Sequence, residues 1–331
     1  MNLAIIGTGK IVSESLYAIQ SIENINLKAI YARKHSEEKG ISFAKKYSID
    51  TVYTDYDELL NNSEIDTVYI GLINSVHYEY AKKALENNKH VILEKPFTGT
   101  YEQACELVDI AINKKLFILE AITVLHSQIF KEMKSNLHKL GKIKAMLCNY
   151  SQYSSRYDNY LKGIVEPAFN PDLYGGALLD INIYNIHYCV GLLGQPRKST
   201  YFANRGFNGV DTSGTIVLEY DGFSAVCTGA KDSDSPSFIS IQGENGYMCI
   251  QGKPNVPQKL TMVLVDKNST PQKDAAGALK RAINTIEFES DTKKHRMVDE
   301  FKNFVDIIDN NRSKEAKKLM DESLEVMKVV G

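Results

Sequence analysis

The chain has 331 residues, which predicts about two domains at roughly 150 residues per domain. Its 39 basic and 41 acidic side chains leave a formal net charge of −2, too small a field to hold a polyanion, so nucleic acid is not an expected partner. Hydrophobic residues make up 43% and charged residues 24%, which excludes a wholly disordered chain.

The sequence gives no sign of a membrane segment or of secretion. No stretch approaches the ~18 apolar residues that span a bilayer, and Met1 to Gly7 runs into an expected buried strand without a basic leader. We therefore expect a cytoplasmic protein. The cysteines are odd in number and scattered, which predicts reduced, mostly buried thiols and neither disulfides nor a metal site. They are Cys105, Cys148, Cys189, Cys227 and Cys249.

The first third of the chain alternates short β-branched runs with segments of helical period, the pattern of βαβ units. It predicts a doubly wound α/β domain over residues 1–122. The expected strands lie near residues 3–6, 27–32, 51–53, 67–71, 90–93 and 117–120. The expected helices cover residues 14–21, 36–47, 78–87 and 101–113.

Residues 123–331 predict an α+β domain with a large, mainly antiparallel open sheet. Asp221-Gly222 and Asn245-Gly246 indicate two hairpins whose tight turns need positive φ at both residues. A long helix is expected over residues 177–193, where Gly194 ends it. Two helices, residues 294–310 and 313–330, end this domain, with packing against the first domain as an alternative.

The motif Gly7-Thr8-Gly9-Lys10-Ile11 follows the first expected strand and precedes a helix. Glycines in this position let the backbone approach a pyrophosphate, and a helix N-terminus offers N–H groups to it. Val12 stands where the fingerprint has its third glycine, so we expect the helix to lie slightly further from the sheet. A tight turn without a ligand is the alternative.

The second strand ends in Arg33-Lys34 and is followed by no acid until Glu37. A carboxylate there would bind the ribose hydroxyls of NAD, whereas two bases suit a 2′-phosphate. The sequence thus predicts NADP, with NAD possible and two solvated surface bases as the alternative.

Two further groups of residues suggest chemistry. Glu94-Lys95-Pro96 follows a strand at the carboxyl edge of the sheet, and Pro96 keeps Lys95 out of helical conformation. Asp180, Tyr184 and His187 are spaced by four and then three, so they share one helix face. A polar network that ties the helix to the sheet is the alternative reading of this row.

On these motifs the chain resembles the Gfo/Idh/MocA oxidoreductase family. The resemblance spans essentially the whole chain and includes the glycine turn, residues 74–77, 94–96, 120–121, 175–184 and 191–194. Tyr184 stands where many members have histidine, like the branch with dimeric dihydrodiol dehydrogenases, NADP-dependent aldose dehydrogenases and glucose-fructose oxidoreductase. The chain departs from that branch at Ile73, Tyr174 and Asn182, and we expect Asn182 to narrow the substrate pocket.

The resemblance implies hydride transfer between NADP(H) and a carbinol or carbonyl carbon of a sugar, cyclic diol or related polyol. Lys95 would act at the reacting carbon, Tyr184 would move the hydroxyl proton, and Asp180 would orient the substrate. Several neighbours receive lesser roles: Leu72, Asn74 and His77 near the cofactor, Glu94 near the nicotinamide ribose, His187 as a supporting or substrate contact, and Tyr153 and Arg156 on the far pocket wall.

The resemblance also implies a homodimer formed through the open sheet of the second domain. Two other function classes stay open: a non-catalytic dinucleotide sensor that kept the fold, and a glycosidase that begins by hydride abstraction from a sugar. The sequence does not name the substrate or the direction of the reaction.

Overall fold

The computed structural model describes residues 1–331, and the chain divides into two compact units. The first unit comprises residues 1–123, 165–175 and 294–331, and the second comprises residues 124–164 and 176–293. A single boundary at residue 122 therefore does not describe the two units. Residues 165–175 group with the first unit, and so do residues 294–331, for which the sequence analysis gave packing against the first domain as the alternative.

A parallel sheet of six strands forms the centre of the first unit, in the order β3-β2-β1-β4-β5-β6. The strands are β1 (Asn2–Ile6), β2 (Asn26–Tyr31), β3 (Thr51–Tyr53), β4 (Thr67–Ile70), β5 (His90–Glu94) and β6 (Ile118–Ala121). The helices between them are α1 (Lys10–Ile19), α2 (Glu37–Tyr47), α3 (Tyr56–Asn61), α4 (His77–Glu86) and α5 (Tyr101–Lys114). The strand order reverses between β1 and β4, the point at which doubly wound sheets bind ligands.

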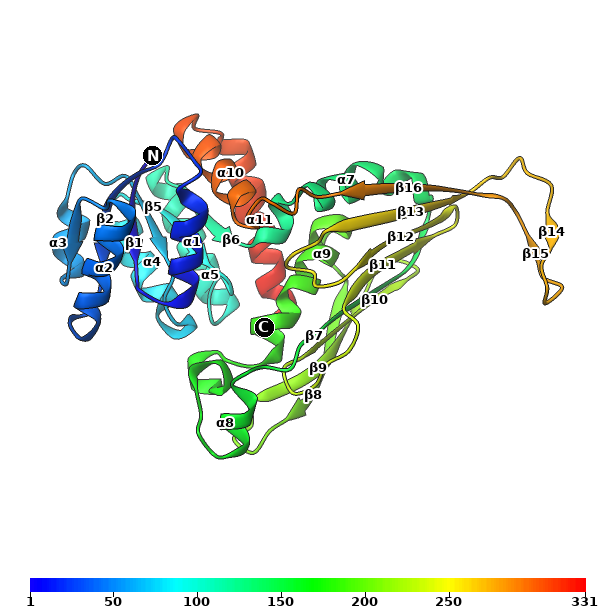
Figure 1. Ribbon diagram of the computed structural model, residues 1–331, viewed down its shortest axis with the longest axis horizontal. Coiled ribbons are helices and arrows are strands. Elements are labelled where there is room, and N and C mark those ends of the chain that lie inside the picture. Colours follow the sequence, from blue (N-terminus) through cyan, green and yellow to red (C-terminus); the bar gives the residue numbers. More distant parts are fainter. The chain divides into compact units, whose positions relative to one another are not determined.

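The two terminal helices, α10 (Val298–Asp309) and α11 (Ser313–Val330), complete the two layers of this unit (Figure 1). Phe301 and Phe304 of α10 pack with the α1 side of the sheet, and Met320 and Met327 of α11 pack with α4 and α5. Burial of these apolar faces explains why both helices join the first unit. None of the helices, the 18-residue α11 included, combines the length and the apolar run that a membrane span requires.

The second unit is built on an eight-stranded sheet in the order β16-β13-β12-β11-β7-β10-β9-β8. Only β7 and β10 pair in parallel, so the sheet is mainly antiparallel, as predicted. Its strands are β7 (Ile143–Ser151), β8 (Lys198–Arg205), β9 (Asp211–Glu219), β10 (Ser224–Ala230), β11 (Phe238–Gly243), β12 (Gly246–Gln251), β13 (Lys259–Val265) and β16 (Ile283–Glu289). The helices are α6 (Thr123–His126), α7 (Gln128–Asn136), α8 (Tyr157–Leu161) and α9 (Ile183–Leu193).

Helix α9 lies against one face of this sheet and is preceded by a π-helical turn, Leu178–Asn182. Three thiols meet where the helix packs on the sheet, with Cys189 Sγ 3.4 Å from Cys227 Sγ and 4.0 Å from Cys148 Sγ. All three are buried and free, as predicted. Gly194, at φ 78°, ends the helix.

Both predicted hairpins form, but their turns differ from the prediction. In the β9–β10 turn only Gly222 has positive φ, at 81°. In the β11–β12 hairpin Gly243 pairs with Gly246, so Glu244 and Asn245 form the turn. Gly246 is instead the first strand residue, where a Cβ would collide with the Val263 carbonyl oxygen, and this crowding explains the glycine.

Between the end of β13 and the start of β16 the chain forms a protruding arm that the sequence did not predict (Figure 1). The arm holds the short strands β14 (Gln272–Lys273) and β15 (Leu279–Lys280), which pair with each other only. Leu279 is 67% exposed there.

Candidate functional site

The glycine turn between β1 and α1 has the geometry of an anion cradle. Gly7 has φ 115°, and a Cβ there would lie 2.7 Å from the Gly71 carbonyl oxygen, so no other residue fits. Gly9 is extended, and α1 begins after it without a side-chain cap or an acid in its first turn. The N–H groups of this helix end can therefore serve a phosphate, which fits the dinucleotide that the sequence predicted. Thr8 and Ile11 are half-buried, whereas Lys10 is exposed.

Val12, at the third position of the fingerprint, is accommodated by a glycine on the neighbouring strand. Val12 is fully buried, and a Cβ on Gly71 would lie 2.7 Å from its Cγ2 atom. The small residue that allows close packing of helix and sheet thus stands at the end of β4 and not in α1.

Arg33 and Lys34 follow the end of β2 after one intervening residue, Ala32, and are both exposed. Glu37, the next acid, belongs to α2. The carboxyl end of β2 therefore presents two cations and no carboxylate, an arrangement that fits a 2′-phosphate.

His77 connects the loop after β4 with the loop after β5. Its Nδ1 lies 2.9 Å from the Pro96 carbonyl oxygen, and its Nε2 lies 3.2 Å from that of Leu72. The ring is fully buried, and burial lowers the pKa of His77 below its ordinary 6.5. The sequence analysis placed His77 near the cofactor, and the structure gives it a role in holding these loops.

Asn74 and Tyr174 lie in the same region of the first unit. Asn74 Nδ2 donates to the Tyr174 carbonyl oxygen at 2.8 Å. Tyr174 itself has φ 55°, a conformation that glycine adopts without strain. Tyr174, one of the positions at which the chain departs from the branch that it resembles, therefore adopts a conformation that favours glycine.

At the end of β5, Glu94 is buried and accepts a 2.7 Å hydrogen bond from the Tyr69 hydroxyl. Burial raises the pKa of Glu94. Lys95, the next residue, is half-buried, and its peptide bond to Pro96 is cis. Lys95 thus stands at the carboxyl edge of the sheet, as predicted, while the expected ribose contact of Glu94 stays a prediction.

In the second unit, Asp180, Tyr184 and His187 form a row of decreasing exposure. The Asp180 side chain is 35% exposed, Tyr184 is 8% exposed, and His187 is fully buried. The Tyr184 ring lies 5.8 Å from that of Tyr150. His187 lies near buried His126, whose pKa burial lowers to about 3. The row runs from an accessible carboxylate into the core, so His187 fits a supporting role better than a substrate contact.

Asn182 does not narrow a pocket, and that expectation is wrong. The side chain is fully buried, and its Nδ2 donates to the Cys227 carbonyl oxygen at 2.9 Å. The Asn182 Oδ1 atom also accepts a hydrogen bond from Asn185 Nδ2. The Asn182 Cβ packs so closely on β10 that a Cβ added to Gly229 would lie 2.6 Å from it. Asn182 therefore fastens the helix to β10.

The sequence analysis missed Lys231, whose Nζ lies 2.7 Å from Asp180 Oδ2. No spacing rule relates these two residues, because strand pairing and helix packing bring them together. The only sequence signal is a lysine directly after the run Ser224–Ala230.

Tyr153 and Arg156 lie on the segment between β7 and α8, and both are exposed. The Tyr153 hydroxyl donates to Asp158 Oδ1 at 2.7 Å, and its N–H donates to Asp234 Oδ1 at 2.9 Å. Their role as a pocket wall stays a prediction.

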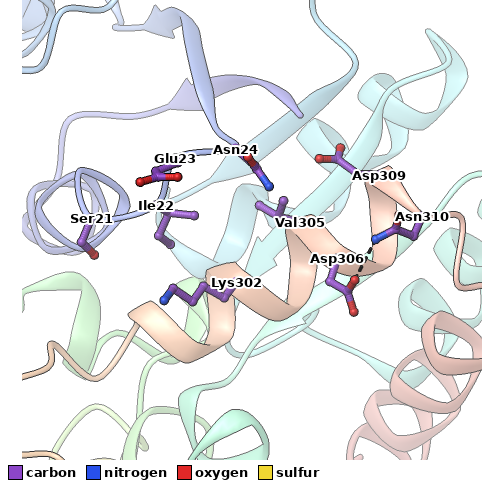
Figure 2. A pocket seen from close by; sticks show the side chains of 9 residues that line it. All are labelled: Ser21, Ile22, Glu23, Asn24, Lys302, Val305, Asp306, Asp309 and Asn310. Atoms are coloured by element: carbon purple, nitrogen blue, oxygen red, sulfur yellow. Dashed lines mark hydrogen bonds between the residues drawn. The ribbon is translucent and has the colours of Figure 1, made fainter.

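Two other features do not form the site. The first is a hollow in the first unit, between α10 and the segment that precedes β2 (Figure 2). It lies at the amino end of β2, whereas the glycine turn lies at the carboxyl end of β1. Its lining is Ser21, Ile22, Glu23, Asn24, Lys302, Val305, Asp306, Asp309 and Asn310.

The second feature is the thiol cluster, whose sulfur atoms lie within 4.8 Å of one another. Burial raises the pKa of the Cys148 thiol, because charge is costly in an apolar interior. We interpret the cluster as core packing.

A doubly wound sheet with an open glycine turn at its switch point, on a chain with a second α+β unit, is typical of a dinucleotide-binding protein. Residues 1–121 match the model of the oxidoreductase family with an NAD-binding Rossmann fold, and residues 134–249 match the Gfo/Idh/MocA C-terminal domain. The chain belongs to the Gfo/Idh/MocA family, and the expectation of an NAD(P)-dependent dehydrogenase or reductase is confirmed.

Among its relatives is the scyllo-inositol 2-dehydrogenase (NADP(+)) IolU of Bacillus subtilis, 37% identical over 76% of each chain. The trans-1,2-dihydrobenzene-1,2-diol dehydrogenase of Xenopus laevis is 28% identical over 80% of this chain and 79% of its own. The solved structure of KijD10, a 3-ketoreductase from Actinomadura kijaniata, in complex with NADP and TDP-benzene, matches with a TM-score of 0.80 at 19% identity. That match covers 99% of this chain and 94% of KijD10 and shows a shared fold.

Proposed function

We propose that the protein transfers a hydride between NADP(H) and a carbinol or carbonyl carbon of a cyclic polyol, sugar or diol. The observation that carries this proposal is the row from Asp180 to Tyr184, an accessible carboxylate beside a nearly buried phenol, on a chain with an anion-binding glycine turn. Relatives named for scyllo-inositol, a dihydrodiol and D-xylose support hydroxyl-rich rings as the substrate class.

Each residue has one task in the oxidation direction. The dinucleotide, when bound, supplies the hydride acceptor. Lys95 places a cation at the carbinol oxygen and stabilises the charge that develops there. Tyr184, in its phenolate form, accepts the hydroxyl proton as the C–H bond breaks and the C=O bond forms, and the resulting phenol then releases that proton to solvent. Asp180 accepts a hydrogen bond from a second substrate hydroxyl, which orients the ring. Reduction reverses each step.

The cofactor preference rests on Arg33 and Lys34. NADPH should bind more tightly than NADH in a titration followed by nicotinamide fluorescence, with little protein background because the chain has no Trp. Replacement of both residues by alanine should weaken NADPH binding by about 10–100-fold, the value of lost charge-assisted hydrogen bonds, and leave NADH binding unchanged.

The matched control removes two cations elsewhere in the same unit. Lys45→Ala with Lys46→Ala, on the exposed face of α2, makes the same change in net charge. This control should keep the preference for NADPH. Equal NADPH and NADH affinities in the unaltered protein would contradict the assignment of Arg33 and Lys34.

We also infer a homodimer formed through the face of the eight-stranded sheet that α9 does not cover. Phe202, Thr215, Thr228, Asn149 and Phe238 are cross-strand neighbours on this face. Exposed apolar side chains accompany them, with Phe202 62%, Tyr247 44% and Leu147 39% exposed. Light scattering at micromolar concentration should give twice the 37.1 kDa chain mass, and a monomer would contradict this surface.

A further inference from the structure

We propose that Lys231 is a positioning residue of the reaction, which holds Asp180 ionised and in one orientation for an uncharged, hydroxyl-rich substrate. The inference rests on the proposed function and adds a residue that the motifs do not contain. Its basis is the 2.7 Å ion pair between Lys231 Nζ and Asp180 Oδ2.

The main chain fixes the start of the Lys231 side chain. The residue follows β10 directly, its N–H donates to the Thr212 carbonyl oxygen at 2.9 Å, and its own carbonyl accepts from Ser154 N–H at 2.9 Å. The side chain is only 4% exposed. A long, flexible side chain is thus held between β9 and the segment after β7, so its ammonium group has little freedom.

Burial makes a partner for this ammonium obligatory, since an unpaired charge in the interior is costly. Two other carboxylates nearby already have donors of their own. Asp232 accepts from the hydroxyls of Thr212, Ser213 and Ser233. Asp211 likewise has donors of its own.

Asp211 accepts from the Tyr201 hydroxyl at 2.6 Å and from Leu178 N–H at 2.7 Å. The second bond fastens the first residue of the π-helical turn that carries Asp180. π-Helical turns inside helices are frequent at functional sites.

The other end of this turn is fastened to the strand that leads into Lys231. Asn182 donates to the Cys227 carbonyl oxygen, and Asn185 donates to that of Thr228 at 3.0 Å. Strand β10 thus holds both partners of the ion pair in one frame. The Asp180 side chain nevertheless keeps 35% of its surface exposed.

This arrangement separates anchoring from recognition. A buried cation on one side of the carboxylate orients it and favours its ionised form. The pair carries no net charge, so it offers a hydrogen-bond acceptor to a neutral hydroxyl and no excess charge to attract an acid or a base. The substrate class that matches it is a neutral polyol.

The test is a double-mutant cycle on kcat/KM with NADP and the best polyol of a substrate panel. It uses the full-length protein with Lys231→Met, Asp180→Asn, both together, and Lys231→Arg. We expect Lys231→Met and Asp180→Asn to lower kcat/KM by about 10–100-fold each, the double variant to lose little more, and Lys231→Arg to recover most of the activity. NADPH binding should stay within about twofold throughout, because the cofactor residues are untouched.

The control is Lys162→Met, which removes an exposed lysine from the same unit and should leave kcat/KM unchanged. A merely structural role for Lys231 would give losses that multiply in the double variant and no rescue by arginine, and that result overturns the inference. If the apolar variant does not fold, Lys231→Gln takes its place in the cycle. If Lys231→Met turns over as fast as the wild-type protein, the inference about Lys231 is refuted and the proposed function still stands. If the wild-type protein itself shows no turnover, the proposed function is refuted.

Discussion

The residues assigned to the cofactor and to the reacting oxygen lie within two residues of strand ends in the first unit, with Gly7 after β1, Arg33 after β2 and Lys95 after β5. In the second unit Asp180 lies in the π-helical turn and Tyr184 lies near the start of α9. Lys231 follows β10, far along the chain, and forms an ion pair with Asp180. In a parallel sheet the carboxyl ends of all strands lie at the same edge. The position of a residue just after a strand is therefore enough to predict that it lies at the site of the first unit. The second region depends on tertiary packing that no local pattern encodes.

The two largest effects should come from Tyr184 and from Lys95, the assigned cation of the strand-edge region. We expect Lys95→Met to lower kcat by at least ~10²-fold, because a preorganised charge at the reacting oxygen is typically worth 10²–10³-fold. NADPH affinity should change little in a fluorescence titration. Lys318→Met, an exposed lysine of α11, is the matched control. Full activity of Lys95→Met would break the assignment.

Tyr184 tests the helix region in the same way. Tyr184→Phe should reduce kcat by about 10²–10⁴-fold, the usual contribution of a positioned proton-transfer group. Tyr188→Phe, one turn later in α9, removes a buried hydroxyl that lies 3.4 Å from the Pro254 carbonyl oxygen and should keep kcat within a few-fold. Equal kcat values for the two variants would show that Tyr184 moves no proton.

The sequence predicted most of the fold but less of the candidate site. Strand and helix periods, the glycine turn and both hairpins were readable, because each depends on neighbouring residues. The turn residues in the second hairpin were not predicted, and the sequence left two alternatives for the unit to which α10 and α11 belong. Both depend on contacts with distant strands.

The site shows the same division between local and distant contacts. The contact of His77 with the Pro96 carbonyl oxygen and the attachment of Asn182 to β10 involve backbone groups 19 and 45 residues away along the chain. No alternation or spacing of side chains indicates such partners. Lys231 escaped prediction for the same reason.

A smaller effect tests how Val12 fits without the third glycine. Gly71→Ala should lower the free energy of unfolding by about 1–3 kcal/mol, the typical cost of overpacking, since its Cβ would meet Val12 Cγ2. Adding Val12→Gly should recover part of that loss in urea unfolding. Gly9→Ala is the control, because its nearest neighbour would lie 3.9 Å away. A Gly71→Ala protein as stable as wild type would contradict the packing argument.

The smallest effect concerns Glu300, a fully buried carboxyl of the first unit. Burial, and then the charge of Glu94, raises the pKa of Glu300 well above its ordinary value of 4.5. The folded protein keeps this proton while the unfolded chain releases it, so the stabilisation is complete below pH 4.5 and is lost as pH rises through the folded pKa. Relative to Glu300→Gln, wild-type stability should therefore fall as pH rises from 5 to 8. Parallel stability curves from denaturant unfolding would refute this.

The central claim is that the two regions together oxidise a polyol with NADP. It is tested most directly by the initial rate of absorbance change at 340 nm with NADP or NAD and a panel of inositols, aldoses and cyclic trans-diols. We predict turnover with at least one of these polyols, faster with NADP than with NAD and absent in Lys95→Met. Tight NADPH binding without turnover on any member of the panel would contradict the account and favour a non-catalytic dinucleotide sensor.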